Sequence, residues 1–222
     1  MSDRKVFTAF KGEVFGGLSR LFKALSNPGR LEILELLSQG EKSVDGIVQG
    51  TGMSVANTSQ HLQLLKSNNI VRSRKEGHYV YYSLISDEFL SLYLQMTKYA
   101  LKEIDELEKL VHARRDGFQT QDAVSLDELE KMVKAGNVLL LDLRPAEEYL
   151  SGHISGAQSV PMEELVAGLK EIGREKEIVA YCRGPFCLLA DEAVSILRGS
   201  GYAARRLEAG YPAWKVRAFS PS

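Results

Sequence analysis

The segment EIVAYCRGPFCLLADEAVSILRGSG, residues 177–201, holds both cysteines of this 222-residue chain. Its nearly continuous apolar run up to Tyr181 predicts a strand of a parallel sheet that is covered on both faces. The residues after it predict a helix that begins near Phe186 or Cys187. We therefore expect Cys182 in a turn that joins the end of a buried strand to the beginning of a helix.

That position favours a reactive sulfur at Cys182. Backbone N–H groups converge in such a turn, and the dipole of the following helix adds positive potential. Arg183 adds a full positive charge next to the cysteine. All three effects stabilise the thiolate, which is the nucleophilic form of cysteine. The alternative is that Cys182 is simply a small apolar residue at the end of a strand.

Helices and strands alternate along the second half of the chain, after a change of pattern around residues 115–117. Alternation of this kind predicts an α/β domain with a parallel sheet. Besides the helix after the cysteines, the expected helices are 125–136, 145–152, 163–172 and 210–215, and the expected strands are 138–144, 177–182 and 203–208.

Three blocks of this half resemble, in order, the rhodanese family of sulfurtransferases, over about residues 120–218. They are DLR through GHI (142–154), the cysteine loop (residues 182–187) and GYPAW (210–214). The resemblance implies a rhodanese-like α/β fold and a cysteine that accepts sulfur from a donor as a persulfide and passes it to a thiophilic acceptor. It makes Cys182 the sulfur carrier, with Arg183 beside it, and it makes Asp142 and Arg144 a structural ion pair near the site.

The cysteine loop departs from the pattern of that family. The family reads Cys-x-x-Gly-x and then Arg or Thr, whereas here the glycine comes one place early, at Gly184, and the sixth position is Cys187. Pro185 also lacks an N–H group that could bond an anion. Thiosulfate therefore cannot be assumed as the sulfur donor. Cys187 is either a resolving thiol, which would turn a Cys182 persulfide or sulfenate into a disulfide or a longer sulfur bridge, or a packed small residue.

The first half of the chain is helical in pattern. Apolar spacings of three and four residues predict two helices within residues 18–40, separated at Asn27, with Pro28 as the first residue of the second. The elements expected after them are a short helix in residues 43–52 capped by Ser43, a helix over 55–69 capped by Ser54, a hairpin over 70–85 with its turn at 75–78, and one long helix over 87–115 capped by Asp87.

A short helix, a turn with glycine, a second helix and a basic hairpin make a winged helix-turn-helix. Asn and Gln bond adenine through two hydrogen bonds, Ser bonds phosphates or bases, and small residues let the backbone approach the groove. Basic side chains of the hairpin suit phosphate contacts. The expected DNA contacts are Ser54, Ala56, Asn57, Ser59, Gln60 and Gln63 of the second helix, here called the reader helix, and Arg72, Arg74 and Lys75 of the hairpin.

The segments LFKALSNPGRLEILELL (21–37), SVANTSQHLQLLKSNNIV (54–71) and RKEGHYVYYSL (74–84) together resemble the ArsR family of winged helices, over roughly residues 15–110. The resemblance implies a homodimer that pairs through its first and last helices and binds a near-palindromic operator in double-stranded DNA. The apolar stripe of the 87–115 helix independently predicts a partner, because so small a domain cannot bury it.

Many members of that family sense metals, and this sequence departs from them. The thiolate pair that they carry in the first helix of the motif is absent, and of their His-and-carboxylate site on the last helix only His112 is present. A zinc site normally needs two or more sulfur or imidazole ligands. We therefore expect neither a metal ion nor another cofactor.

The composition is typical of a cytoplasmic protein without a membrane partner. It is 44% hydrophobic and 26% charged, with no run of 18 apolar residues and no secretory signal. Two cysteines in such a chain indicate reduced thiols rather than a disulfide framework. Residues 1–116 carry 16 basic and 14 acidic side chains, and the remainder carries 12 and 15, so the half with the reader helix is the more positive.

The sequence thus predicts a mainly α winged helix-turn-helix domain over residues 1–115 and an α/β rhodanese-like domain with a parallel sheet over 116–222. The leading hypothesis is a transcriptional regulator, specifically a repressor, whose Cys182 carries or senses reactive sulfur such as polysulfide or thiosulfate. The alternative is a sulfurtransferase whose helical half only dimerises or tethers it, and a third reading is an arsenate or other oxyanion site in the cysteine loop. The polar face of the reader helix favours the regulator, because a tether does not need it.

Overall fold

The computed structural model describes residues 2–118, 120 and 122–219, with the side chains of those between residues 8 and 217. The chain divides into two compact units, residues 1–89 and residues 90–222. The domain limits expected from the sequence assign residues 90–115 to the first half instead, and those limits stay a prediction.

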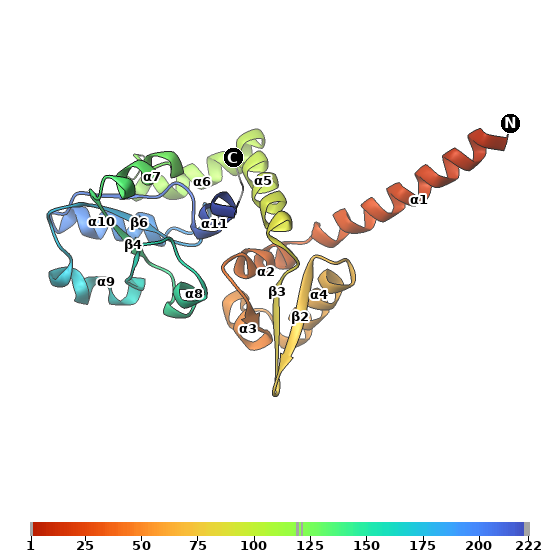
Figure 1. Ribbon diagram of the computed structural model, residues 1–222, viewed down its shortest axis with the longest axis horizontal. Coiled ribbons are helices and arrows are strands. Elements are labelled where there is room, and N and C mark those ends of the chain that lie inside the picture. The colour runs from red at the N-terminus through yellow and green to blue at the C-terminus, as the bar shows by residue number, and fades with distance from the viewer. Residues whose placement is uncertain (1, 119, 121, 220–222) are drawn as a thin grey trace. The chain divides into compact units, whose positions relative to one another are not determined.

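The first unit is mainly helical. Helices α1 (Ser2–Leu25), α2 (Pro28–Ser38), α3 (Val44–Thr51) and α4 (Val55–Ser67) precede the hairpin of β2 (Val71–Glu76) and β3 (Tyr79–Leu84) (Figure 1). In the described part of the chain β1 (Lys42–Ser43) adds an antiparallel strand beside β3, which the sequence did not predict. The side chains buried between α2, α3 and α4 include Ile33, Leu34, Ile47, Leu62 and Leu65. This is the expected winged helix-turn-helix, and α4 is its reader helix.

Local residues explain where the motif helices begin and end. The hydroxyl oxygens of Ser43 and Ser54 accept hydrogen bonds from the N–H groups of Gly46 and Asn57, at 3.0 and 3.3 Å. Such bonds satisfy N–H groups that lack a partner inside the helix. Gly52 ends α3 with a φ of +67°, a conformation that favours a residue without Cβ. The predicted caps of α3 and α4 are therefore confirmed.

The expectation of one long helix over residues 87–115 is wrong. The segment is divided at Ile104 into α5 (Asp87–Glu103) and α6 (Asp105–Arg115), and Ile104 itself is extended, with φ −109° and ψ 95°. The first turn of α6 contains three acidic side chains. Negative side chains stabilise a helix N-terminus through the helix dipole, so this acidic run favours a new helix start over a continued helix.

The second unit is an α/β domain, as the sequence predicts. In the described part of the chain its strands β4 (Val138–Asp142), β5 (Gln158–Ser159), β6 (Glu177–Tyr181) and β7 (Ala204–Arg206) form a parallel sheet in the order β5-β4-β6-β7. The α-helices that accompany this sheet are α7 (Leu126–Lys134), α8 (Ala146–Ser151), α9 (Met162–Gly168), α10 (Leu189–Gly199) and α11 (Tyr211–Phe219) (Figure 1).

Both faces of this sheet are covered, which explains its continuous apolar strands. Ile178 and Ala180 of β6 pack with side chains of α9 and α10, whereas Val179 and Tyr181 pack on the opposite face with side chains of α7 and α11. Cys182 directly follows β6 and belongs to the core on the α10 side. The site therefore lies at the carboxyl end of a central parallel strand, where open α/β sheets form their binding sites.

The limits of some elements differ from those expected. Ser86, rather than Asp87, caps α5, because its hydroxyl oxygen accepts the N–H of Phe89 at 3.3 Å. The helix expected over 163–172 is shorter, and a single 3-10 turn (Leu169–Glu171) follows α9. A similar turn (Asp116–Phe118) follows α6.

Within the described ranges, no helix is long and apolar enough to span a lipid bilayer.

Candidate functional site

The cysteine loop closes as a tight turn before α10 begins. The N–H of Cys187 donates to the carbonyl oxygen of Gly184 at 3.1 Å. Pro185 then occupies the second position of a four-residue turn, a position that proline favours because its φ is already set. The turn directs Cys187 back toward Cys182, and α10 begins at Leu189, later than the sequence predicts.

The two thiols form a hydrogen-bonded pair. Cys182 is only 5% exposed, and Cys187 is half-buried. The Cys182 thiol donates to the carbonyl oxygen of Cys187 at 3.4 Å and is also hydrogen-bonded to the Cys187 sulfur. Backbone N–H groups bond both sulfurs, from Gly184 and Ala190 to Cys182 and from Arg183 and Leu189 to Cys187. The fold thus brings together the two cysteines that the sequence marked as a candidate pair.

Of these two sulfurs, Cys187 loses its proton first. The hydrogen bond from the Cys182 thiol lowers the pKa of Cys187 to about 7 despite burial, and the nearby N–H groups and the charge of Arg183 act in the same direction. That hydrogen bond, together with burial, raises the pKa of Cys182 well above its ordinary value. The lower pKa thus belongs to Cys187, whereas the sequence analysis placed the thiolate at Cys182, and Cys182 as the sulfur carrier stays a prediction.

Arg183 is held by a buried carboxylate. Its Nη2 lies 2.7 Å from Oε1 of Glu148 in α8, and the Glu148 side chain is 1% exposed. Arg183 therefore adds less positive potential at the sulfurs than an unpaired guanidinium would. The sequence analysis missed Glu148, although it is one of the acidic residues that follow Pro145.

The ion pair of Asp142 and Arg144 is completely buried, with its closest N···O distance at 2.6 Å. Asp142 also accepts a hydrogen bond of 2.6 Å from the hydroxyl of Tyr181, and Arg144 donates to the carbonyl oxygen of Gly152 at 2.7 Å. Burial and the Asp142 carboxylate raise the pKa of Tyr181. Because Tyr181 directly precedes Cys182, this network fixes the end of β6, where the cysteine loop begins.

The GYPAW block packs directly on the cysteine loop. A Cβ at Gly210 would lie 2.3 Å from the carbonyl oxygen of Arg183 and 2.5 Å from the nitrogen of Gly184, so a side chain does not fit. The N–H of Tyr211 donates to the carbonyl oxygen of Cys182 at 3.4 Å. This contact explains why a glycine stands at the start of that block.

A second group of charged residues, not anticipated from the sequence, adjoins the loop. Arg115, the last residue of α6, donates to the carbonyl oxygen of Pro185 at 2.7 Å. It also lies 3.6 Å from the carboxylate of Asp191, which Arg206 contacts at 3.0 Å. Thr120 donates a further hydrogen bond to Asp191. These contacts join residues that are 15 to 76 positions apart in the sequence, which is why no local pattern indicates them.

In the first unit, the reader helix presents the polar face that the sequence predicts. Thr58, Leu62 and Leu65 are buried against the rest of the unit. Of the candidate DNA contacts on this helix, Ser59 is half-buried. The others are exposed, namely Ser54, Ala56, Asn57, Gln60 and Gln63. Ser54 is also the N-cap, so its oxygen is already engaged by the backbone. The face has the amide groups needed to read base edges in the major groove.

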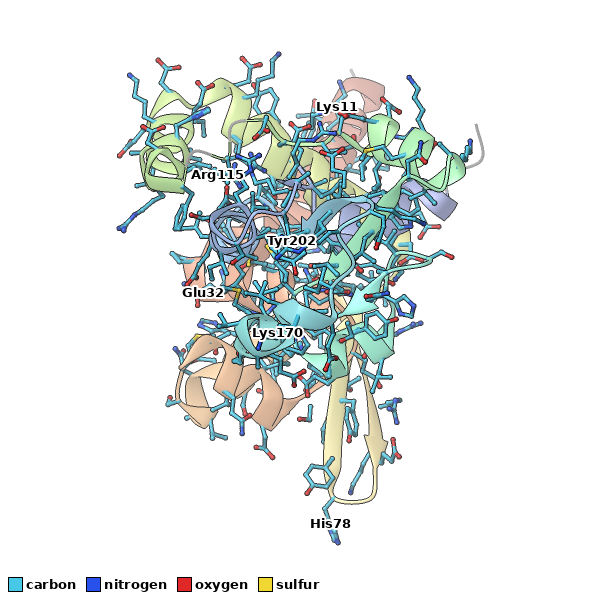
Figure 2. The ribbon with its side chains drawn as sticks, turned by 90° about the vertical axis from the view of Figure 1, so that its left-hand side faces the viewer. Lys11, Glu32, His78, Arg115, Lys170 and Tyr202 are labelled. Carbon is cyan, nitrogen blue, oxygen red and sulfur yellow. The ribbon has the colours of Figure 1, made fainter. Side chains whose placement is uncertain are left out.

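The hairpin of β2 and β3 forms the wing, with His78 at its tip (Figure 2). Arg72 and Lys75 are exposed, and the Nε of Arg72 donates to the hydroxyl of Ser83 at 3.1 Å. Arg74 is engaged differently. Its guanidinium forms ion pairs with Glu41 and Glu76 and lies 4.6 Å from the ring centre of Tyr81. The hydrogen bonds to these carboxylates raise the pKa of Arg74 and compete with any phosphate.

Each of the two units matches a known protein family. Residues 27–73 match the bacterial regulatory protein, arsR family, and residues 125–217 match the rhodanese-like domain. The chain is 38% identical to the HTH-type transcriptional regulator Rv0324 of Mycobacterium tuberculosis over 206 residues, which are 93% of this chain and 90% of that protein. This chain belongs to the ArsR family of transcriptional regulators.

Two further similarities cover the DNA-reading half of this ArsR-family regulator. The transcriptional repressor SdpR of Bacillus subtilis is 34% identical over 67 residues, 30% of this chain and 74% of that protein. A homodimeric winged helix-turn-helix DNA-binding domain from Mycobacterium bovis is 36% identical, with a TM-score of 0.42, and covers 47% of this chain and 91% of that chain.

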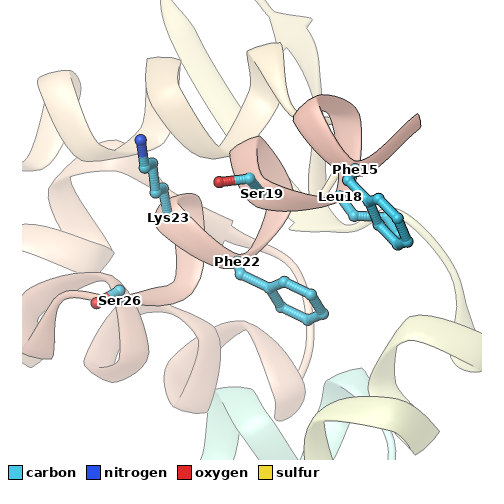
Figure 3. A pocket seen from close by; sticks show the side chains of 6 residues that line it. All are labelled: Phe15, Leu18, Ser19, Phe22, Lys23 and Ser26. Atoms are coloured by element: carbon cyan, nitrogen blue, oxygen red, sulfur yellow. The ribbon is translucent and has the colours of Figure 1, made fainter. Parts of the chain in front are cut away.

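The ArsR-family regulator also carries exposed apolar side chains outside the cysteine loop and the reader helix. Phe15 and Phe22 of α1 line an open groove together with Leu18 and Lys23 (Figure 3). Exposed apolar residues of α5 and α6 are Leu92, Tyr99, Leu107 and Leu110, with Ile104 between the helices.

Among the described residues, no group of three or more His, Cys, Asp or Glu side chains is arranged to hold a metal ion.

Proposed function

We propose that this ArsR-family regulator binds operator DNA as a homodimer, as a repressor, and that sulfur chemistry in the cysteine loop changes its affinity for that operator. One observation carries the proposal. The chain's two cysteines form a hydrogen-bonded pair in a loop of converging N–H groups, and the same chain carries an exposed polar reader helix. A sulfur-transfer enzyme alone has no use for that helix face.

Sulfur loading starts at Cys187 in this proposal. Its thiolate, the more exposed of the two sulfurs, attacks a sulfane sulfur of polysulfide. The S–S bond of the donor breaks, the shortened polysulfide leaves with the electron pair, and Cys187 becomes a persulfide. The donor supplies the oxidising equivalents, so no further oxidant is needed. With thiosulfate as donor, the leaving group is sulfite.

Cys182 then acts on the Cys187 persulfide. Attack on the outer sulfur moves that sulfur to Cys182 and regenerates the Cys187 thiolate, and the proton that Cys182 loses passes to the transferred sulfur. Attack on the inner sulfur forms a Cys182–Cys187 disulfide and releases sulfide, which takes up the proton that Cys182 loses. The family resemblance supports the first course, with Cys182 as carrier, and the proximity of the two thiols supports the second. Both change the charge or the shape of the cysteine loop.

DNA binding is supported by the reader helix and the wing. Exposed amides of Asn57, Gln60 and Gln63 suit adenine edges in the major groove, and Arg72 and Lys75 suit phosphates. Homodimer formation is supported by the apolar side chains exposed on α1, α5 and α6, because such surface is unfavourable in water unless a partner covers it. A two-fold dimer would present two reader helices to a near-palindromic operator.

The test is operator binding by the full-length protein before and after polysulfide treatment, with loading measured by mass spectrometry. A labelled fragment from upstream of the protein's own gene is the probe, and fluorescence anisotropy gives the affinity. We expect loading to weaken binding by about tenfold. Cys182→Ser should retain operator binding and lose most of this response.

The controls separate the two halves of the proposal. Gln63→Ala should weaken operator binding, whereas Gln158→Ala, an exposed glutamine of β5, should not. Unchanged affinity of a fully loaded protein would exclude sulfur sensing while leaving DNA binding intact. If no operator is bound, and Cys182→Ser abolishes sulfur transfer to cyanide, the protein is the tethered sulfurtransferase instead.

A further inference from the structure

Arg115 contacts both sides of the turn that carries the cysteines. One arm of its guanidinium, Nη2, donates to the carbonyl oxygen of Pro185 at 2.7 Å, within the turn. The Nε lies 3.6 Å from Oδ2 of Asp191, in the first turn of α10. The Arg115 side chain is 17% exposed and that of Asp191 is 1% exposed. Arg115 thus bridges the cysteine loop and the helix that follows it.

This group contains two basic and two acidic side chains. Arg115 and Arg206 share the carboxylate of Asp191, and Glu208 adds a second negative charge that acts on Arg206. Burial, with repulsion from Arg115, lowers the pKa of Arg206. Two arginines that share one buried carboxylate repel each other, and further negative charge nearby relieves that repulsion. A sulfur anion in the cysteine loop would add such a charge.

We propose that Arg115 is a positioning residue, which holds the cysteine loop in the form that accepts sulfur and passes a change in that loop to α6. The first part rests on the contacts of Arg115 with Pro185 and Asp191. The second part rests on the proposed function, because it concerns how loading reaches the DNA-reading half.

The route follows the chain itself. Arg115 ends α6, α6 follows α5, and α5 begins at Asp87, three positions after the wing strand β3 ends at Leu84. A disulfide or a transferred persulfide changes the loop, and Pro185 then no longer offers its carbonyl oxygen to Arg115 in the same place. Arg115 loses a charge-assisted hydrogen bond, and α6 loses its attachment to the loop.

Several charged groups surround the sulfurs, so the test must isolate Arg115. They are Arg183 of the loop, Glu148 of α8, Asp191 of α10, Arg206 of β7, Glu208 directly after β7 and Arg115 of α6. Arg115→Gln removes the charge, and Arg115→Lys keeps the charge but not the forked geometry. Arg114→Gln is the matched control, because Arg114 is the exposed neighbour and loses the same charge.

The first measurement is the rate of cysteine alkylation against pH in the full-length protein. We expect Arg115→Gln to move the midpoint upward by about one pH unit, since it removes a nearby positive charge. Arg115→Lys should restore part of this shift, and Arg114→Gln should not move the midpoint. A merely structural arginine would change thermal stability without moving the midpoint, and that result would overturn the positioning role.

The second measurement is operator affinity with and without polysulfide, at equal loading verified by mass spectrometry. The wild type should lose about tenfold in affinity and Arg115→Gln less than about twofold, with the same affinity when unloaded. Because coupling is reciprocal, operator DNA should weaken loading of the wild type and not of the variant. A full response in Arg115→Gln would overturn the transmitting role.

The two proposals fail in different ways. If the wild type itself shows no response to loading, the proposed function fails and the transmitting role fails with it, while the alkylation profile still decides the positioning role. If Arg115→Gln is too unstable to assay, the alkylation profile of Arg115→Lys decides the positioning role. A midpoint and a DNA response both equal to those of the wild type would show that the charge suffices. The bridge to Pro185 and Asp191 would then not be required.

Discussion

The pair of sulfurs shows how burial decides which of two identical side chains becomes the nucleophile. Cys182 and Cys187 share the N–H groups of one loop, but Cys182 belongs to the core and Cys187 is half-buried. Ionising the more buried sulfur costs more, and it also loses the hydrogen bond to its neighbour. The first negative charge therefore belongs to Cys187, and the pair titrates as a unit.

This argument predicts that Cys187 is alkylated first. Its pKa is about 7, so the rate should rise as the pH increases through 7 and level off above 8, and it should fall about tenfold per pH unit below 6. Iodoacetamide labelling followed by peptide mapping measures both sites. In Cys182→Ser the serine hydroxyl can replace the thiol as hydrogen-bond donor to Cys187, so the midpoint should shift little. Cys182→Ala removes the donor, so the midpoint should shift upward more. Labelling that begins at Cys182 would contradict the assigned order.

Among the basic side chains of the wing, the structure favours Lys75 over Arg74 as a phosphate contact. Arg74 is bound to Glu76 of the wing and to Glu41, which directly precedes β1, so its charge is largely compensated. A phosphate must displace those carboxylates before Arg74 can contact DNA. Lys75 is exposed on the same hairpin.

The prediction concerns the salt dependence of operator binding. Lys75→Ala should reduce the slope of log affinity against log salt concentration by about 1, as expected for the loss of one phosphate contact. The double variant Arg74→Gln/Glu41→Gln removes an ion pair without changing the net charge, and its slope should stay within about 0.3 of wild type. Anisotropy titrations over a range of salt concentrations measure both. An equal reduction in the double variant would restore Arg74 as a DNA contact.

For the assembled protein, the apolar residues exposed on α1 predict a partner. Phe15 is 63% exposed and Phe22 is 60% exposed, on the same helix. Two exposed phenylalanines on one helix favour burial against a second copy of the chain. That copy would also supply the second reader helix.

The corresponding test introduces a charge into that surface. Phe15→Glu should raise the dimer dissociation constant at least about tenfold, because a carboxylate loses its hydration at an apolar interface. Operator affinity should fall with it. Val166→Glu is the control, since Val166 is 64% exposed on α9 of the other unit. Sedimentation equilibrium measures the association. A wild type that is monomeric at all concentrations, or a variant that dimerises normally, would contradict the expectation.

Several features were predictable from neighbouring residues alone. Ser43, Ser54 and Gly52 limit helices through bonds or dihedral angles that involve residues at most four positions away. The hairpin and the strand before Cys182 follow from patterns with a period of two or from continuous apolar runs. The break at Ile104 was missed because propensity and apolar spacing continue across it, and only the acidic run after it marks a new helix start.

The amino-acid sequence by itself determined the two kinds of unit, the reader helix with its polar face, and the placing of both cysteines between a buried strand and a helix. These features depend on short-range spacing, which a linear chain contains. Tertiary structure alone decided that Cys187 ionises before Cys182, that Glu148 holds Arg183, and that Arg115 reaches the cysteine loop. Ionisation depends on burial and on charges brought near by folding, and contacts such as that of Arg115 with Pro185 join residues 70 positions apart.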